Sequence, residues 1–142
     1  MFYIFVNSNS GSNPFMFELG FKFFRFCVVG LSGMAIDYGI TFLGKEKIKI
    51  NKYVANGLGF IFAATSNFFF NKFWTFDDKS PDELVQYSKY LSFALIGLGI
   101  NTLIIYLLIN KRNMNFYWAK LIAIGIVVIW NFIANYNFTF LQ

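Results

Sequence analysis

The sequence predicts an all-α fold, namely a polytopic membrane protein with four transmembrane helices built from a tandem two-helix repeat. The composition is the first observation behind this prediction, because 57% of the 142 residues are hydrophobic and only 13% are charged, whereas about 25% charged residues are usual in soluble domains. The second observation is a set of four apolar stretches, each approaching the roughly 20 residues that a bilayer demands of a helix. The third is a motif that the second and fourth stretches share.

The four predicted spans are continuously apolar and do not alternate between apolar and polar residues. Helices therefore fit them better than barrel strands, because backbone groups in lipid must find their partners within each segment. The spans are Phe23–Leu43, Tyr53–Phe70, Tyr90–Ile109 and Ala119–Ile133. Residues 1–21 are expected to form an N-terminal tail that is disordered or interfacial, and residues 22–142 to form the four-helix transmembrane domain.

Polar loops separate the predicted spans. The first loop, residues 44–52, is rich in lysine, the second, residues 77–83, is acidic, and the third covers residues 110–113. Proline at a first helical position and acidic residues in a first turn both favour the start of a helix. Pro81 and its acidic neighbours therefore predict a short interfacial helix, Asp82–Lys89, that leads into the third span.

An internal repeat is the strongest signal of organisation. Tyr53–Phe76 aligns without a gap with Tyr117–Phe140, and seven of these 24 positions are identical. The preceding spans also align, with Phe26–Gly30 opposite Phe93–Gly97. The protein is therefore expected to consist of two copies of a two-helix unit.

The two copies are expected to cover about residues 22–76 and 84–140. A repeat with two spans returns the chain to its starting side, so both copies should have the same orientation in the membrane. This is the parallel-repeat architecture of some transporters, in which substrate sites lie between the repeats.

Each predicted span has one small or polar face. Buried amides hydrogen-bond across membrane helices for about 1 kcal/mol each, and small residues let the backbones approach. Helix packing therefore explains the asparagines without any ligand, and a polar substrate path is the alternative. The asparagine and lysine positions on these faces are Asn67, Asn71, Asn101, Lys120, Asn131 and Asn135. The glycines predicted to pack helices are Gly30, Gly33 and Gly97.

Asp37 is the acidic residue inside the first predicted span. An ionised carboxylate near the middle of a bilayer costs about 2.5–3.5 kcal/mol or more on insertion scales, so it should face the bundle, a water-filled cavity or a basic partner. Its functional roles would be to carry a proton or to accept hydrogen bonds from sugar hydroxyls. The structural alternative is a tie to Lys120, Lys52 or an asparagine.

Lys72 and Trp74 stand where the second predicted span leaves the bilayer. Snorkelling lysines and interfacial aromatic residues are ordinary at such positions. The functional alternative is that Lys72, Asn71 and Lys89 hold an anionic lipid headgroup through charge-assisted hydrogen bonds to its phosphate oxygens.

Several function classes lack the residues that they need. The chain has one cysteine and no histidine, so a disulfide framework, a zinc site and histidine acid–base chemistry are not predicted. The formal charge of +5 comes from residues that bracket apolar runs, which disfavours a nucleic-acid partner. No nucleophile–base set and no glycine-rich phosphate loop is present. An enzyme is therefore disfavoured, and we expect neither a metal nor a cofactor.

The motif Asn-x-x-x-Asn-Lys-x-Trp-Thr-Phe at residues 67–76, together with Val29-Gly30 and Asp37-Tyr38, resembles the GtrA-like family of small membrane proteins. The resemblance covers about residues 22–140. It implies a protein of cell-surface polysaccharide biosynthesis that translocates a polyprenyl-phosphate-linked sugar across the cytoplasmic membrane.

The resemblance implies that Asp37 corresponds to the family's intramembrane aspartate. Lys72 stands where the family more usually has arginine. A lysine there weakens bidentate recognition of phosphate but keeps the charge. In the second copy Tyr136 occupies the basic position and Phe138 the tryptophan position, so an equivalent second phosphate site is not expected. The resemblance implies that Thr75 and Phe76 also belong to the family's motif. The resulting candidate substrate-binding residues are Asp37, Asn67, Asn71, Lys72, Trp74, Asn101, Lys120, Asn131 and Asn135.

The leading hypothesis is a flippase for a polyprenyl-phosphate-linked sugar, and its expected partners are that lipid, membrane lipids, a membrane glycosyltransferase and a further copy of the chain. One alternative is a non-transporting partner that positions a glycosyltransferase, and another is a small proton-coupled exporter. The resemblance implies a multi-pass protein of the cytoplasmic (inner) membrane with both termini in the cytoplasm. The positive-inside rule favours the opposite orientation, because seven lysines and arginines lie on the side of the first and third loops and five on the other.

Overall fold

The computed structural model describes residues 14–140 of the chain. Its four α-helices form two hairpins, and short π-helical segments extend three of them. The elements are α1 (Pro14–Phe42), η1 (Leu43–Lys47), α2 (Lys52–Phe70), η2 (Asn71–Thr75), α3 (Glu83–Arg112), α4 (Phe116–Ala134) and η3 (Asn135–Phe140). No strand occurs in residues 14–140, and the predicted all-α class is confirmed.

Three segments are long and apolar enough to cross a membrane, namely Pro14–Lys47, Glu83–Arg112 and Trp118–Phe140. The protein is therefore a polytopic helical membrane protein. The fourth helix, α2, corresponds closely to the predicted second span but does not meet the same criterion of apolarity. Its polar residues include two asparagines, Thr65 and Ser66.

Two predicted boundaries are wrong. Residues 82–89 do not form a separate interfacial helix, because Glu83 begins the continuous 30-residue helix α3. Residues 14–21 of the predicted N-terminal tail are helical and belong to α1, which covers Pro14–Phe42 among the described residues. Residues 1–13 of that tail, and residues 141–142 at the other end, lie outside the described residues.

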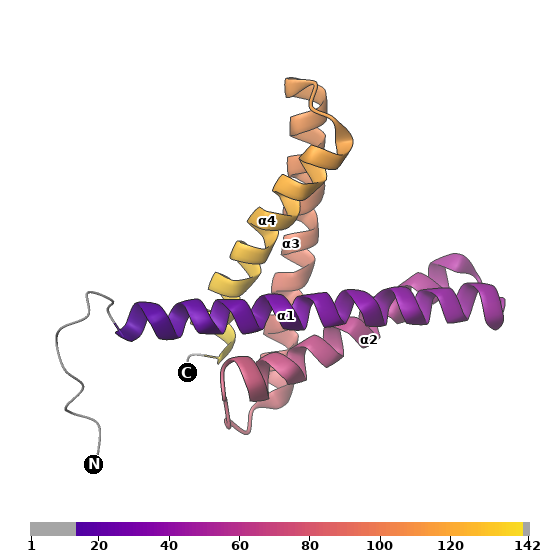
Figure 1. Cartoon of the computed structure of the whole chain (residues 1–142). Coiled ribbons are helices and arrows are strands. Elements are labelled where there is room, and N and C mark those ends of the chain that lie inside the picture. Colours follow the sequence, from indigo (N-terminus) through magenta and orange to yellow (C-terminus); the bar gives the residue numbers. More distant parts are fainter. Residues whose placement is uncertain (1–13, 141–142) are drawn as a thin grey trace, which may run out of the picture.

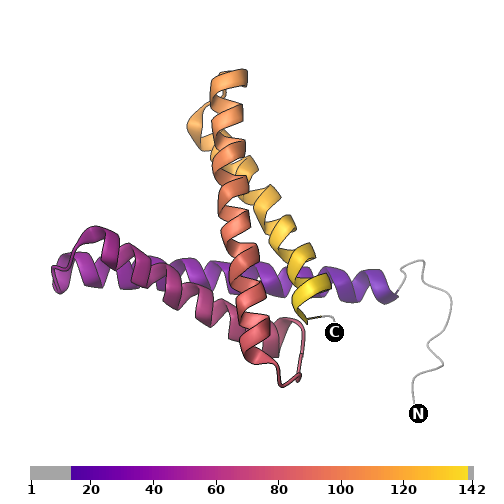
Figure 2. The same ribbon diagram turned by 180° about the vertical axis from the view of Figure 1, so that it is seen from behind.

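The two hairpins pack internally and cross each other (Figure 1). α1 lies along α2, and α3 lies along α4. The α3–α4 hairpin rises steeply away from the α1–α2 hairpin, and Figure 2 shows the same arrangement from behind. The hairpins therefore meet at one end, where α2 leads into α3 and α4 leads into η3.

An aromatic cluster fills this junction. Phe68, Tyr90 and Phe140 are buried, and Phe76 and Tyr87 pack against them. The rings of Phe76 and Phe140 are stacked with centroids 4.7 Å apart, and such aromatic pairs contribute about 0.5–1.5 kcal/mol beyond the area that they bury. The phenylalanines of the two motif copies thus join the hairpins.

The same glycine–asparagine contact occurs in both hairpins. Gly33 of α1 lies against the amide of Asn67 in α2, and Gly97 of α3 lies against Asn131 in α4. A Cβ atom at Gly97 would stand 2.9 Å from Asn131 Oδ1, and one at Gly33 would lie closer still to the Asn67 amide. The two helices of each hairpin therefore approach closely at a point where a residue larger than glycine would have to displace the asparagine amide.

This contact corrects the predicted register of the repeat. Gly33 and Gly97 are 64 residues apart, as are Asn67 and Asn131, whereas the sequence alignment placed Gly30 opposite Gly97. A Cβ atom at Gly30 would have no heavy atom within 4 Å, so Gly30 does not pack helices within this chain.

The hairpin loops have the same 64-residue spacing. Lys49 precedes α2 with a φ of 60°, and Asn113 precedes α4 with a φ of 51°. In this register Asn101 of α3 is the counterpart of Asp37 in α1. The corrected alignment therefore places a polar residue at the same position of the first helix in both hairpins.

Candidate functional site

Lys72 is buried, although the sequence placed it at the membrane interface. Only 1% of the residue is exposed. Its ammonium group donates to the carbonyl oxygen of Ser80 at 2.8 Å and to Gln86 Oε1 at 2.6 Å. The same Gln86 donates through Nε2 to the Asp78 carboxylate and to Ser80 Oγ. Lys72 therefore fixes the connection between η2 and α3 and has no free face toward a lipid phosphate.

The asparagine that precedes Lys72 is also held by neighbours. Asn71 donates to the Tyr90 hydroxyl at 3.2 Å and accepts a hydrogen bond from Thr75 Oγ1 at 2.8 Å. In the second copy Asn135 accepts from Thr139 Oγ1 at 2.9 Å. The repeated Asn-x-x-x-Thr pair thus lies within each terminal π-helical segment, where its hydrogen bonds are satisfied inside the fold.

Asn67 and Asn131 occupy the two helix crossings. The Oδ1 atom of each is buried and has no hydrogen-bond partner among the described residues. A buried polar oxygen without a partner costs about 1–3 kcal/mol. Each crossing therefore carries a buried acceptor that makes no hydrogen bond with the described residues.

Asp37 is partly buried and faces α2. Thr41 Oγ1 lies 3.4 Å from its Oδ1 atom. A Cβ atom at Gly59 of α2 would collide with the Asp37 side chain and with Thr41. Among the side chains that the structure describes, Asp37 has no ion-pair partner, so the structural alternative of a tie to Lys120 is wrong. The side chain of Lys52 lies outside the described ones.

The remaining predicted residues are dispersed. Asn101 is half-buried in α3, Lys120 is exposed on α4, and Trp74 is exposed at the end of η2. The nine predicted substrate-binding residues therefore do not converge on one cavity. Some of them belong to hydrogen-bonded groups at the hairpin junction, and the others are separate polar positions along the helices.

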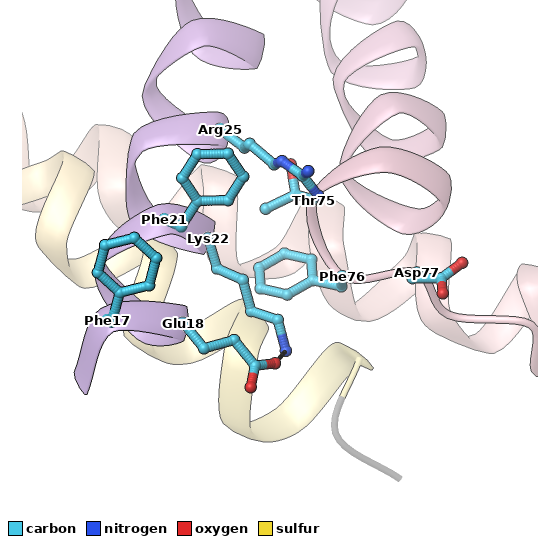
Figure 3. Close-up of a pocket in the computed structure, with 8 residues that line it drawn as sticks. All are labelled: Phe17, Glu18, Phe21, Lys22, Arg25, Thr75, Phe76 and Asp77. Atoms are coloured by element: carbon cyan, nitrogen blue, oxygen red, sulfur yellow. Dashed lines mark ion pairs between the residues drawn. The ribbon is translucent and has the colours of Figure 1, made fainter. Parts of the chain in front are cut away.

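An open pocket of about 460 Å³ lies between the first turns of α1 and the end of η2 (Figure 3). It has two cations, two carboxylates, a threonine and three phenylalanines. The lining residues are Phe17, Glu18, Phe21, Lys22, Arg25, Thr75, Phe76 and Asp77.

The two cations of this pocket come from neighbouring turns of α1. Lys22 Nζ lies 2.9 Å from the Glu18 carboxylate and 5.9 Å from the centre of the Tyr136 ring. Arg25 donates to the carbonyl oxygen of Trp74 at 2.9 Å, and its guanidinium group lies 4.6 Å from the centre of the Phe21 ring. Together they link α1 to both copies of the repeated motif.

Sequence reasoning did not identify this pocket as a site. In the sequence, Lys22 and Arg25 bear only on the orientation in the membrane, because they stand at the start of the first predicted span and match no motif. The spacing of Glu18, Lys22 and Arg25 places them on one face of a helix. This signal becomes readable once α1 is known to begin at Pro14.

The fold and these polar positions define a small polytopic helical membrane protein made of two crossed hairpins. Residues 25–140 match the family described as GtrA/DPMS, transmembrane domain, and the chain belongs to this family. It is also similar to the cell wall teichoic acid glycosylation protein GtcA of Listeria monocytogenes, with 30% identity over 83 residues, or 56% of this chain. The chain matches 57% of the length of that curated relative.

Proposed function

We propose that this protein translocates a polyprenyl-phosphate-linked sugar across the cytoplasmic membrane for the glycosylation of a cell-surface polymer. Membership of the GtrA/DPMS transmembrane domain family supports the proposal, as does similarity to a protein named for teichoic acid glycosylation. The structural observation that carries it is the cationic and aromatic pocket that the start of the first membrane span forms with the end of η2.

The polar positions in the apolar helices suit the passage of a sugar. Moving hydroxyl groups into hydrocarbon without hydrogen-bond partners costs roughly 2–7 kcal/mol per group. Asp37 and Asn101 occupy equivalent positions in the two hairpins, and the Oδ1 atoms of Asn67 and Asn131 lack partners within the described chain. These side chains provide acceptors for hydroxyl groups, while the polyprenyl tail stays in the lipid.

The contacts also reassign several predicted residues. In this proposal Lys72, Asn71 and Asn135 maintain the hairpin ends and do not bind substrate, because their polar atoms already have partners. Trp74 acts through its backbone carbonyl, which holds Arg25 at the pocket. We assign the pocket side to the cytoplasm, where both ends of the described chain then lie.

A second candidate function is a membrane partner that positions a glycosyltransferase. A shallow apolar hollow on the outer face of α3 favours it, because such a surface accommodates either lipid or a helix of another protein. The hollow is lined by Leu95, Leu98, Gly99, Thr102, Leu103 and Tyr106.

Deletion of the gene distinguishes these two functions. Loss of a flippase is expected to leave the polymer without its sugar while the polyprenyl-phosphate-linked sugar accumulates, and mass spectrometry of extracted lipids measures that accumulation. Restoring the wild-type chain should reverse both effects. Loss of the sugar lipid together with the polymer modification would contradict translocation and indicate the glycosyltransferase partner.

A further inference from the structure

We infer that the pocket formed by Lys22 and Arg25 of α1 with Thr75 and Asp77 binds the phosphorylated head group of the lipid before it crosses the membrane. This inference rests on the proposed function and identifies where its substrate first binds. The pocket volume of about 460 Å³ lies within the range of roughly 300–1,000 Å³ that small-molecule sites occupy.

Arg25 has unused capacity for an anion. The structure records one hydrogen bond from its guanidinium group to a described residue, the Trp74 carbonyl, whereas a guanidinium group carries five N–H donors. Among the described ion pairs, Arg25 has no carboxylate partner. Its contacts with the Phe21 and Trp74 rings hold the planar group in place, so that its remaining donors suit the planar, bidentate recognition of phosphate.

Lys22 is held by an ion pair that a phosphate can displace. The Glu18 side chain in this pair is 67% exposed, and exposed ion pairs contribute only about 0–1 kcal/mol. A phosphate that binds Lys22 and Arg25 together would free the Glu18 carboxylate. That carboxylate and Asp77 then become acceptors for the hydroxyl groups of the attached sugar.

The aromatic side of the pocket favours a lipid over a soluble anion. Phe17 is 74% exposed and Phe21 is also exposed, although both lie on the apolar helix α1. Figure 3 shows the Phe17 ring near Glu18 and the Phe21 ring near Lys22 and Arg25. Both rings lie on the segment Pro14–Lys47, which is apolar enough to cross a membrane, so an isoprenoid chain in the lipid can lie against them while its phosphate binds Lys22 and Arg25.

The first experiment measures binding of farnesyl phosphate to the full chain in detergent by native mass spectrometry. Farnesol, which lacks the phosphate, and glucose 1-phosphate, which lacks the lipid, are the comparison ligands. Farnesyl phosphate is expected to bind at least about tenfold more tightly than either, because charge-assisted hydrogen bonds and apolar burial act together. Equal binding of farnesol would overturn the phosphate assignment, and equal binding of glucose 1-phosphate would overturn the lipid assignment.

Variants locate the site. Arg25→Gln and Lys22→Gln should each weaken farnesyl phosphate binding about tenfold, while Arg25→Lys should retain part of it. Lys111→Gln removes the same charge from the far end of α3 and serves as the matched control. If Arg25→Gln does not fold, Lys22→Gln still tests the site, because the recorded contacts of the Lys22 ammonium group with described residues are the exposed Glu18 carboxylate and the Tyr136 ring. Binding by both variants equal to that of Lys111→Gln would overturn the inference.

The same variants separate the pocket from the transport function. Phosphate-dependent binding that needs Lys22 and Arg25, combined with no acceleration of flipping in vesicles, would support the pocket and contradict translocation. If the wild type accelerates flipping and both variants accelerate it equally, the result would support translocation and contradict the pocket as the loading site.

Discussion

The ammonium group of Lys72 lies 2.6 Å from Gln86 Oε1, which joins the end of the first hairpin to the start of the second. The same glutamine bonds Asp78 and Ser80, so one side chain connects a buried cation, a carboxylate and the loop between them. The buried Lys72 ammonium group therefore finds its hydrogen-bond partners within the protein. The lysine of the sequence motif is therefore a structural element of the hairpin junction.

Gln86→Leu is predicted to destabilise the protein. The substitution removes the side-chain acceptor of the buried ammonium group, and hydrogen bonds to charged groups contribute about 1.5–3 kcal/mol. Thermal unfolding in detergent, followed by far-ultraviolet circular dichroism, measures the loss. Ser88→Ala changes an exposed residue two positions away and serves as the control. Equal melting temperatures for the two variants would contradict the assigned role of Gln86.

Gly97→Ala is predicted to destabilise the second hairpin by about 1–3 kcal/mol, as overpacking usually does. The added Cβ atom would lie 2.9 Å from Asn131 Oδ1 and 3.2 Å from Val127 Cγ1. Gly99→Ala is the matched control in the same helix, because its Cβ atom would have no neighbour within 4 Å. That variant should be stabilised by up to about 1 kcal/mol through helix propensity. Unfolding in sodium dodecyl sulfate compares them, and the reverse order would contradict the described crossing.

The same comparison in the first hairpin tests the corrected register. Gly33→Ala should destabilise the protein about as much as Gly97→Ala, since both glycines face an asparagine, whereas Gly30→Ala should not destabilise it. The same unfolding measurement applies. A larger effect at Gly30 than at Gly33 would restore the register that the sequence alignment suggested.

The orientation in the membrane is tested by labelling cysteines with an impermeant maleimide. Cys27 is the chain's single cysteine, so Cys27→Ser gives the cysteine-free protein into which each test cysteine is introduced. With the pocket side in the cytoplasm, Asn113→Cys should be labelled in intact cells and Lys79→Cys only after permeabilisation. The opposite labelling pattern would place the pocket on the outer side and contradict head-group loading from the cytoplasm.

The sequence predicts the helices well because lipid imposes a simple length and polarity rule on them. The predicted spans Phe23–Leu43 and Tyr53–Phe70 match the cores of α1 and α2. The sequence does not predict the beginning of α1, because Glu18 and Lys22 interrupt the apolar pattern before the predicted span and Arg25 lies within its first turn. In the structure these residues form one polar face that contributes to the pocket.

The site was harder to predict because its chemistry depends on tertiary contacts. Lys72 carries the same sequence signal whether it snorkels to the interface or bonds Gln86, which is 14 positions away. The register of the repeat depends on which glycine meets an asparagine, and Gly30 and Gly33 are equally small. Arg25 is recognisable as part of a site only when the end of η2 is known to lie beside α1.

The rate of head-group translocation in proteoliposomes tests the central claim most directly. Vesicles with the purified chain receive a short-chain polyprenyl-phosphate-linked sugar in one leaflet, and an impermeant enzyme that acts on the sugar reports its arrival in the other. Wild-type protein should accelerate arrival over protein-free vesicles, and Asp37→Asn, at equal protein content, should reduce the rate. The same rate with wild-type protein as without protein would contradict translocation.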